Sequence, residues 1–406
     1  MNIKGLNLHQ GQKRLVKEIF ENKDAKYHVI NTSRQTGKTV LISQLLLYYS
    51  INNKKTVSWY CAPIHSVAKR MYKFIFNAIK NSPVLLYANK TDMELELFNG
   101  STIKFTGVDK YDNLRGGSVS YFFLDEFAFY REEVWNEALK QMMAVRGRKA
   151  FFVSTPNGKH NLFYNFSKLG QSSENERYDY HFATFRENPY YDKAEVDDAK
   201  KTLPDFIYRQ EYEAEFIDLG VELFQNLDLV SKDIKFKGNG PYYAGLDLGR
   251  QNDYTVLTIV DKDNKVIDWY RDNQKSWELM VNNVVNMLKK YNCPVLVEVN
   301  SIGDVVFEMI KKQWNKSYAF HTTGESKNPL IENMLIHFQN SDILIPSKKI
   351  YKELHEEIAT YIVEYTASKR SFKYTHAVGF HDDCVDSLAL SLLCKKTKQN
   401  IGVHFI

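Results

Sequence analysis

Cysteine is scarce in this sequence of 406 residues, and long apolar runs are absent from it. The four cysteines stand at positions 61, 293, 384 and 394 and form no C-x-x-C pair, so neither a zinc site nor a disulfide framework is indicated. That usage fits a reducing cytosol. The first fifteen residues lack the apolar core of a signal peptide. No stretch approaches the roughly 20 apolar residues that a membrane span needs, so we expect no membrane association.

The composition is that of a globular protein with many aromatic residues. Hydrophobic residues make up 44% of the chain and aromatic residues 14%. The length leaves room for two or three domains, each with its own core. The formal net charge of +5 is mildly basic. That charge permits an anionic partner such as nucleic acid without requiring one.

A phosphate-binding loop is predicted within residues 27–49, which read as a buried strand, a tight turn and an apolar helix. The turn, TSRQTGKT, ends in Gly-Lys-Thr but has Thr32 where the motif usually has its first glycine. A strand–turn–helix aims backbone N–H groups and the positive end of a helix dipole at phosphate oxygens. Lys38 would reach the β and γ phosphates of a nucleotide, and Thr39 would hold Mg²⁺. A bare Gly-Lys-Thr also occurs by chance in unrelated proteins.

An acidic pair downstream favours ATP hydrolysis. Residues 121–129, YFFLDEFAF, predict a buried strand that delivers Asp125 and Glu126 to the edge of a sheet. Asp125 would lie behind the Mg²⁺ ligands, and Glu126 would orient or deprotonate the attacking water. The alternative is a strand that ends in a solvated Asp-Glu. Because the pair follows a phosphate-binding loop, an ATPase is the favoured interpretation.

Three further features are candidates for binding the nucleotide or for responding to its hydrolysis. The amide of Gln12, or of Gln10 as second choice, can read the donor and acceptor edge of adenine. Arg115 stands beside two glycines and could reach a neighbouring subunit's γ-phosphate in a ring, while Arg34 could act within its own subunit; this alternative stays open. Residues 154–158, STPNG, end a predicted central strand, where small polar side chains can sense hydrolysis.

The pattern of elements predicts three parts along the chain. Residues 1–160 form the ATPase core. Residues 161–225 are polar, charged and helical in character, and we expect a lid or linker that completes the ATPase domain. Residues 226–406 restart as an α/β domain. The boundary falls near 218–230, although no flexible linker marks it.

Carboxylates in the second half predict a metal site. Asp247 and Glu298 come at the ends of two predicted strands, and Asp382 and Asp383 open the last apolar helix. Oxygen ligands of this kind suit Mg²⁺ or Mn²⁺, and two such ions about 4 Å apart can activate water and stabilise a leaving oxygen. The alternatives are a loop-capping carboxylate at Asp247 and N-capping of the helix by Asp382 or Asp383. The combination favours a metal cage.

These motifs in this order resemble the large terminase subunit of tailed bacteriophages, and the resemblance covers nearly the whole chain. It rests on the phosphate loop, the acidic strand, the Ser-Thr-Pro segment, the Asn-Leu-Arg-Gly segment and the stretch before the second domain, which are residues 33–39, 124–127, 154–156, 113–116 and 210–216. The implied fold is α/β, with an N-terminal P-loop ATPase domain of the ASCE type followed by an RNase H-like nuclease domain.

The resemblance also implies site residues. Nucleotide contacts would come from Gln12, Ser33, Arg34, Gln35, Thr36, Gly37, Lys38, Thr39 and Asp125. The nuclease triad would comprise Asp247, Glu298 and a residue of His381-Asp382-Asp383, with Asp253 as a further carboxylate near the metals. Asp383 is the first choice for the third position and Asp382 the second. Asp386 is assigned to helix packing or to the surroundings of the ligands.

The implied activity is ATP-driven movement of double-stranded DNA into a procapsid, with metal-dependent cutting of concatemeric DNA. The implied cofactors are ATP with Mg²⁺ for the motor and two Mg²⁺ or Mn²⁺ ions for the nuclease. The implied partners are DNA, the portal protein and the small terminase subunit, with a ring on the portal and a monomer allowed in isolation, in the cytoplasm of the infected host. A DNA-repair helicase–nuclease and a non-enzymatic DNA-binding scaffold are the alternatives.

Overall fold

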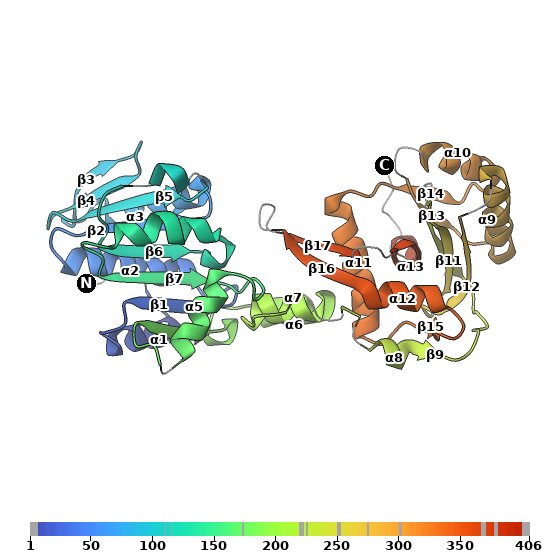
Figure 1. The fold of residues 1–406 in the computed structure, drawn as a ribbon, viewed down its shortest axis with the longest axis horizontal. Helices are drawn as coiled ribbons and strands as arrows, with labels where there is room; N and C mark the ends of the chain where they lie inside the picture. The colour runs from blue at the N-terminus through green and yellow to red at the C-terminus, as the bar shows by residue number, and fades with distance from the viewer. Residues whose placement is uncertain are drawn as a thin grey trace. The chain divides into compact units, whose positions relative to one another are not determined.

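The computed structural model describes residues 7–109, 111–114, 116–172, 174–218, 223–224, 226–249, 253–273, 276–299, 303–366, 371–376 and 381–399. The chain divides into two compact units, Met1–Ala199 with Phe206–Asp218 and Lys200–Asp205 with Leu219–Ile406. Each unit is built around a sheet (Figure 1). None of the helices in the described ranges has the length and apolar composition needed to cross a membrane.

A mostly parallel sheet forms the centre of the first unit. Its described strands lie in the order β3 (Leu85–Asn89), β4 (Glu94–Leu97), β5 (Thr102–Gly107), β2 (Val57–Ala62), β6 (Tyr121–Asp125), β7 (Lys149–Ser154), β1 (Tyr27–Thr32) and β8 (Tyr178–Ala183). Only the pairs β3–β4 and β4–β5 are antiparallel among these strands. The carboxyl ends of β1, β6 and β7 therefore meet at one edge, which is where open α/β sheets bind ligands.

Both faces of this sheet are covered by helices. One face carries α1 (Gln10–Glu21), α2 (Lys38–Asn52) and α3 (His65–Ile79), and the other carries a π-helical segment (Val134–Leu139) that runs into α4 (Lys140–Met142), with α5 (Leu162–Gln171). Successive strand residues point to opposite faces, so Phe122 packs in one core and Phe123 in the other. Double-sided burial explains why these strands read as unbroken apolar runs.

The expectation for residues 161–225 needs correction. The segment holds α5, α6 (Lys193–Thr202) and α7 (Asp205–Tyr212), but it also supplies β8, which pairs in parallel with β1 along its length. Part of the expected lid or linker is therefore the edge strand of the main sheet. Its sequence, YDYHFA, mixes polar with aromatic residues because an edge strand is covered less completely than a central one.

The second unit has a smaller mixed sheet. Its strands lie in the order β12 (Val266–Asp272), β11 (Thr255–Asp261), β10 (Tyr242–Asp247), β13 (Val295–Glu298) and β14 (Ser317–Phe320). β10 is antiparallel to β11 but parallel to β13. Leu246 pairs with Val297 in that ladder, so the residues that follow, Asp247 and Glu298, end neighbouring strands at the same edge.

Helices cover both faces of the smaller sheet as well. α9 (Trp277–Tyr291) and α10 (Gly303–Gln313) share one core with β10, β11 and β13. α13 (Asp383–Gln399) packs on β10 and β11, beside α11 (Gly324–Gln339) and α12 (Lys352–Thr360). Smaller elements complete the unit: α8 (Leu227–Val230), the pair β9 (Ser231–Lys232) and β15 (Ile345–Pro346), and the hairpin of β16 (Tyr361–Thr366) and β17 (Ser371–His376).

Gly245 allows α13 to lie directly against β10. A Cβ atom at this position would stand 2.2 Å from the Ser387 carbonyl oxygen and 2.3 Å from the Ser391 nitrogen. The Ser387 hydroxyl bonds the Gly245 carbonyl and the Thr258 hydroxyl, each at 2.9 Å. This close approach brings the first turn of α13 to the end of β10.

Candidate active sites

The predicted phosphate loop is a turn that connects β1 to α2. Gln35 and Gly37 have positive φ angles of 60° and 82°, and Gly37 directly precedes the helix. A Cβ atom on Gly37 would lie 2.4 Å from Gln12 Nε2 and would displace that side chain, and the positive φ angle itself favours glycine. The first N–H groups of α2 have no acceptor within their own helix, which suits the start of a helix to binding an anion.

Side chains inside the loop hold its shape. Thr36 Oγ1 donates to the Ser33 carbonyl at 2.8 Å, and Ser33 Oγ accepts the Phe185 N–H at 2.7 Å. The Ser33 N–H donates to the Ala183 carbonyl, and Asn188 Nδ2 donates to the Gln35 carbonyl. The loop therefore rests on the segment that follows β8.

Gln12 also supports the loop. Its Nε2 donates to the Gly37 carbonyl at 2.8 Å, and its Oε1 accepts the His9 N–H at 3.0 Å. The side chain is almost fully buried. Both ends of the amide are thus occupied by backbone groups, which differs from an amide turned toward an adenine base, and reading of the base by Gln12 stays a prediction.

The acidic pair lies against the lysine of the loop. Lys38 Nζ is 3.3 Å from Glu126 Oε1. Asp125 is buried at the end of β6, where its Oδ2 accepts the Tyr60 hydroxyl at 2.5 Å and its Oδ1 accepts the Glu126 N–H at 3.0 Å. Burial and the neighbouring charge of Glu126 raise the pKa of Asp125. A cation beside this pair would therefore be stabilised.

Ser154, at the end of β7, connects the acidic pair to the Ser-Thr-Pro segment. Its hydroxyl donates to Glu126 Oε2 at 3.5 Å and accepts the Ala128 N–H at 3.2 Å. Glu126 has a left-handed backbone with φ of 53°, which a non-glycine residue seldom adopts. Because of the hydrogen bond between Ser154 and Glu126, a displacement of the Glu126 carboxylate would also act on Ser154 at the end of β7.

The remaining candidates of this site lie at its margin. The Arg34 side chain is 67% exposed and forms an ion pair with Glu211. The Arg34 backbone N–H donates to the Glu211 carbonyl. Thr39 is exposed in the first turn of α2. Arg115 lies outside the described residues, so the choice between Arg34 and Arg115 stays open.

The second site is a cluster of carboxylates at the edge of the smaller sheet. Asp247, Glu298 and Asp386 each offer an oxygen atom, and these atoms lie within 4.8 Å of one another. Asp386 comes from the first turn of α13, which Gly245 admits to the end of β10. The three-residue group that converges thus differs from the sequence-based set, because Asp386 takes the place expected for Asp383.

The electrostatics of this cluster favour a cation. Burial raises the pKa of Asp247 well above its usual value, and Glu298 and Asp386 raise it further. Burial also raises the pKa of Asp386 to about 7, although Lys327 opposes that effect. An oxygen-only donor set that converges in this way fits Mg²⁺ or Mn²⁺.

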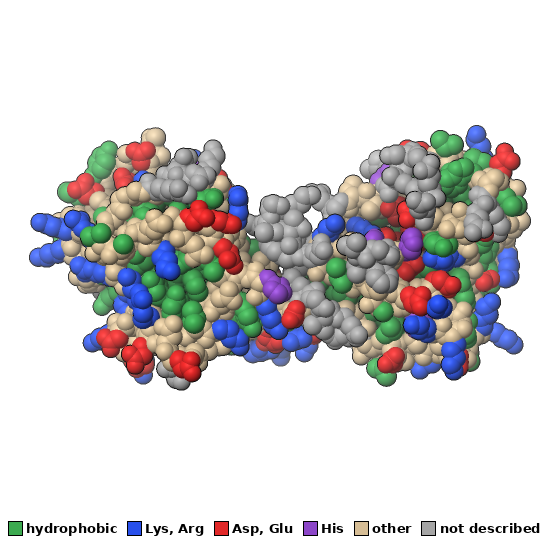
Figure 2. Space-filling view, in the orientation of Figure 1, with side chains coloured by type: hydrophobic (Ala, Val, Ile, Leu, Met, Phe, Trp, Pro, Cys, Tyr) green, Lys and Arg blue, Asp and Glu red, His purple; other side chains and the backbone are tan. Residues whose placement is uncertain are grey.

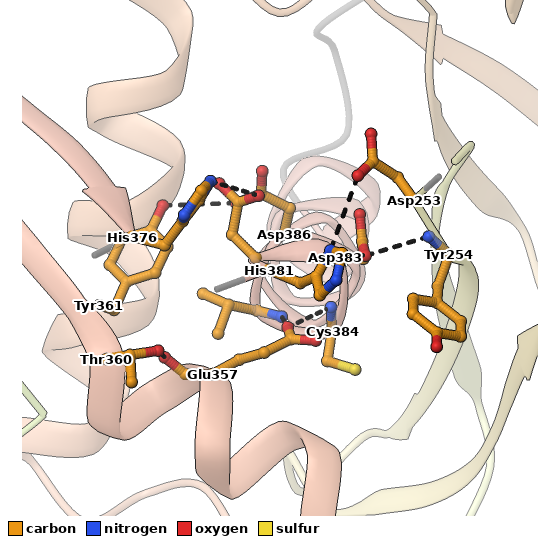
Figure 3. A network of polar contacts seen from close by, with 12 residues as sticks. Asp253, Tyr254, Glu357, Thr360, Tyr361, His376, His381, Asp383, Cys384 and Asp386 are labelled. Carbon is orange, nitrogen blue, oxygen red and sulfur yellow. Dashed lines mark hydrogen bonds and ion pairs between the residues drawn. The ribbon is translucent and has the colours of Figure 1, made fainter. Parts of the chain in front are cut away.

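Lys327 of α11 is the cation that this cluster already contains. Its Nζ is 2.6 Å from Asp386 Oδ2 and 2.8 Å from Asp382 Oδ2. The Tyr361 hydroxyl lies 3.4 Å from Asp386 Oδ1, as Figure 3 shows. Asp382 also lies 3.7 Å from His376 Nε2. The Lys327 ammonium therefore balances part of the negative charge of the carboxylate cluster.

Asp383 points to a different neighbourhood, with Tyr254 and His381 (Figure 3). Its Oδ2 accepts the Tyr254 N–H at 3.2 Å and lies 3.7 Å from His381 Nδ1, which is 3.6 Å from Asp253 Oδ1. Burial raises the pKa of Asp383 to about 6. Figure 2 shows histidine and acidic side chains together on this face of the second unit. Asp383 and Asp253 thus flank the cluster.

Glu357 of α12 anchors the helix that carries these acids. Its Oε2 accepts the Cys384 and Val385 N–H groups at 2.7 and 3.2 Å (Figure 3). A buried carboxylate at the start of a helix interacts favourably with the helix dipole. Burial nevertheless raises the pKa of Glu357 to about 7.

Sequence reasoning missed Lys327, Glu357 and Tyr361, and it ranked Asp386 behind Asp383 and Asp382. Asp382 and Asp386 are four residues apart, a spacing that puts both on one face of a helix, and that signal was available. Lys327, by contrast, lies 55 residues from Asp382, and nothing around it indicates the contact.

The amino-acid sequence matches two family models. One, described as the N-terminal part of the T4-like virus type of terminase large subunit, matches residues 29–231; the other, described as the terminase RNase H-like domain, matches residues 244–395. The terminase large subunit of Thermus virus P23-45 is 25% identical over 90% of this chain and 84% of that protein. That of Escherichia phage T5 is 29% identical over 56% of this chain and 54% of that protein.

A solved structure shares the fold across both units. It is the large terminase of a thermophilic bacteriophage, which matches with a TM-score of 0.52 at 15% identity, covering 96% of this chain and 99% of that one. The match shows that the two folds follow one another in the same order in both chains.

Proposed function

The chain belongs to the large terminase subunit family, with an ATPase domain followed by an RNase H-like nuclease domain, and from this we propose how its residues divide the work. The first site hydrolyses ATP to drive double-stranded DNA into a procapsid. The second cuts concatemeric DNA with divalent metal ions. The observation that carries the proposal is the convergence of Asp247, Glu298 and Asp386 in a chain that also sets Lys38 against Glu126.

In the motor, the loop backbone and Lys38 would hold the triphosphate, and Thr39 would hold its Mg²⁺ with Asp125 behind the ligands. The bound nucleotide supplies the phosphoanhydride bond that is broken. Lys38 exchanges its contact with Glu126 for the phosphates, which leaves the Glu126 carboxylate available to orient the attacking water. Ser154 then transmits the state of Glu126 to the end of β7. Arg34 can act at the γ-phosphate only after it leaves Glu211, whereas Arg115 would act in a neighbouring subunit.

In the nuclease, the carboxylates of Asp247, Glu298 and Asp386 would hold a divalent ion. Such ions, when bound, supply activation of water and charge stabilisation at the phosphodiester. Asp382, Asp383 and Asp253 surround this group and can complete the ligation of a second ion. Lys327 balances the charge of Asp386 and Asp382 while no ion is bound and competes with an ion for them.

The partners follow from the proposed activity. A motor that accepts any sequence should contact DNA mainly through phosphates, so binding should weaken steeply with salt. Figure 2 shows basic and acidic side chains interspersed over the visible face of each unit, so local basic groups must make these contacts. We place the active form as a ring on the portal with a small terminase subunit, in the host cytoplasm.

Paired activity measurements on the full chain test the proposal. Lys38→Ala and Glu126→Ala should abolish ATP hydrolysis and retain Mn²⁺-dependent DNA cleavage, while Asp247→Ala and Glu298→Ala should do the reverse. Unchanged ATP turnover in both motor variants would reject the motor. Movement of duplex DNA without strand separation is expected, and unwinding would favour a helicase–nuclease instead.

A further inference from the structure

A second group of potential metal ligands lies in the first unit, away from the phosphate loop. His28 of β1 and Asp179 and His181 of β8 point to a common centre. His28 Nδ1 is 3.1 Å from His181 Nε2, His181 Nε2 is 3.3 Å from Asp179 Oδ2, and His28 Nδ1 is 3.7 Å from Asp179 Oδ2. Both histidines are almost completely buried.

The register of the two strands creates this convergence. His28 pairs with Asp179, and His181 follows two residues later, so all three side chains emerge on the same face of the sheet. That face is covered by α1. The three groups are therefore held by backbone hydrogen bonds of adjacent strands and not by a loop.

The triangle has the size of one face of a tetrahedral metal site. Zn²⁺ binds histidine nitrogen and carboxylate oxygen at about 2.0–2.2 Å, which places neighbouring ligand atoms of a tetrahedron about 3.3–3.5 Å apart. The three observed separations average close to that spacing. An octahedral site with bonds of about 2.1 Å would need ligands only about 3.0 Å apart.

Hydrogen bonding alone serves these three atoms poorly. The ionised Asp179 oxygen only accepts. If His28 Nδ1 donates to His181 Nε2, then His181 Nε2 and the Asp179 oxygen are both acceptors and lie 3.3 Å apart with no hydrogen between them. If His181 Nε2 carries the hydrogen instead, two acceptors must share it. A divalent cation at the centre accepts an electron pair from all three atoms.

A metal-bound histidine usually donates its outer ring N–H to an acceptor; His181 has a carboxylate near that nitrogen, whereas His28 faces an amine. His28 Nε2 is 3.1 Å from Lys149 Nζ, and the same amine donates to the Ala25 and Lys23 carbonyls. His181 Nδ1 is 3.7 Å from Glu18 Oε2. With an ion at Nδ1, His28 Nε2 would carry the ring hydrogen, so the Lys149 ammonium would turn wholly to the Ala25 and Lys23 carbonyls that it already contacts.

We propose that His28, Asp179 and His181 bind one divalent transition-metal ion, with Zn²⁺ the ion that best suits two imidazoles and a carboxylate. The ion ties β8 to β1. β8 is the last strand of the described sheet and pairs with β1 there, and the residues after it support Ser33 of the phosphate loop. The site is structural, and it is independent of the nuclease metals, whose ligands are all oxygen atoms.

Metal retention and thermal unfolding of the full chain test this site. Protein stripped with a chelator is dialysed against Zn²⁺ and, separately, Co²⁺, and bound metal is measured beside the Co²⁺ absorption spectrum. We expect one tightly held equivalent with a tetrahedral Co²⁺ spectrum, and a rise of about 5 °C in the unfolding temperature of the first unit on Zn²⁺ addition.

Substitutions test which residues bind the ion. His181→Gln and Asp179→Asn should lose the equivalent and the temperature shift, whereas His160→Gln, an exposed histidine of the same unit, and Asp386→Asn should keep both. Because a buried histidine variant can fail to fold, the half-buried Asp179 provides the second test. Retention by Asp179→Asn and His181→Gln, loss in Asp386→Asn, or no tight equivalent in the unaltered chain would each overturn the proposal.

Discussion

Each of the two active sites sets a lysine ammonium against carboxylates, but the two are built in opposite ways. In the first unit, Lys38 makes one contact of 3.3 Å with Glu126. In the second, Lys327 contacts Asp386 at 2.6 Å and Asp382 at 2.8 Å. In the proposed functions, the first lysine belongs to a loop that binds an anion, whereas the second lies in a cluster that binds a cation.

In the proposed functions, the two sites bind through different parts of the chain. The phosphate loop would bind through backbone groups whose positions are set by Gly37 and by the start of α2, so its chemistry is local. The carboxylate cluster consists of side chains from β10, β13 and α13, and it exists only because these elements pack together. Substitutions should therefore disable one site while the other keeps working.

The largest effect should follow loss of the loop lysine. Lys38→Ala removes the charge that meets the phosphates, and we expect ATP hydrolysis to fall by about 100- to 1,000-fold. Mn²⁺-dependent cleavage should remain at its original rate. Steady-state ATPase and plasmid cleavage assays measure both, with the exposed Lys54→Ala as control. An equal loss of both activities would mean that the two sites are not separable.

The next largest effect distinguishes the two acids of α13. Asp386→Asn should lower cleavage by about 100-fold or more, since it removes a charge from the converging group. Asp383→Asn should cost about 10-fold, as expected of a residue that flanks the ligands. Cleavage kinetics at saturating Mn²⁺ provide the comparison, with exposed Asp228→Asn as control. The reverse order would restore Asp383 as the third ligand.

That pair of acids also shows what the sequence could and could not tell. Family membership, the α/β fold with its two successive domains, and the two enzyme classes were predicted and are confirmed. The phosphate loop and the Asp125-Glu126 pair are contiguous motifs, and Asp247 and Glu298 end apolar strands, so local pattern was sufficient to find them. The roles of these residues stay predictions.

What the sequence could not predict depends on packing between distant segments. Asp386 joins Asp247 because Gly245 lets α13 approach β10; the spacing of Asp386 from Asp382 indicates a shared helix face but does not indicate that approach. Lys327 reaches the cluster from α11 for the same kind of reason. β8 was read as part of a lid because an edge strand carries polar residues, and only its pairing with β1 identifies it as part of the sheet.

A moderate effect should come from replacing the nuclease lysine. Lys327→Met keeps the aliphatic stem but removes an ammonium that competes with a metal ion for Asp386 and Asp382. We expect Mn²⁺ to bind about 10-fold more tightly, because the opposing positive charge is gone. Titration calorimetry or the Mn²⁺ EPR signal measures this, with Lys327→Arg as the charge-preserving control. Weaker Mn²⁺ binding would instead make Lys327 a residue that organises the ligands.

The smallest effect is a dependence of stability on pH, which should be stronger in the second unit because burial raises the pKa of more carboxyls there than in the first. Folding raises the pKa of Asp383 to about 6 and that of Asp386 to about 7, from a usual value of 3.8. A carboxyl whose pKa is raised by folding stabilises the protein below its unfolded pKa, and that contribution is lost as pH rises through the folded value. In chelator, the unfolding temperature of the second unit should therefore fall by a few degrees between about pH 4 and 7. Mn²⁺ should remove most of the fall, because a bound cation stabilises the ionised form. Asp386→Asn should flatten the profile in chelator, and a fall as steep as that of the unaltered chain would mean that other groups cause it.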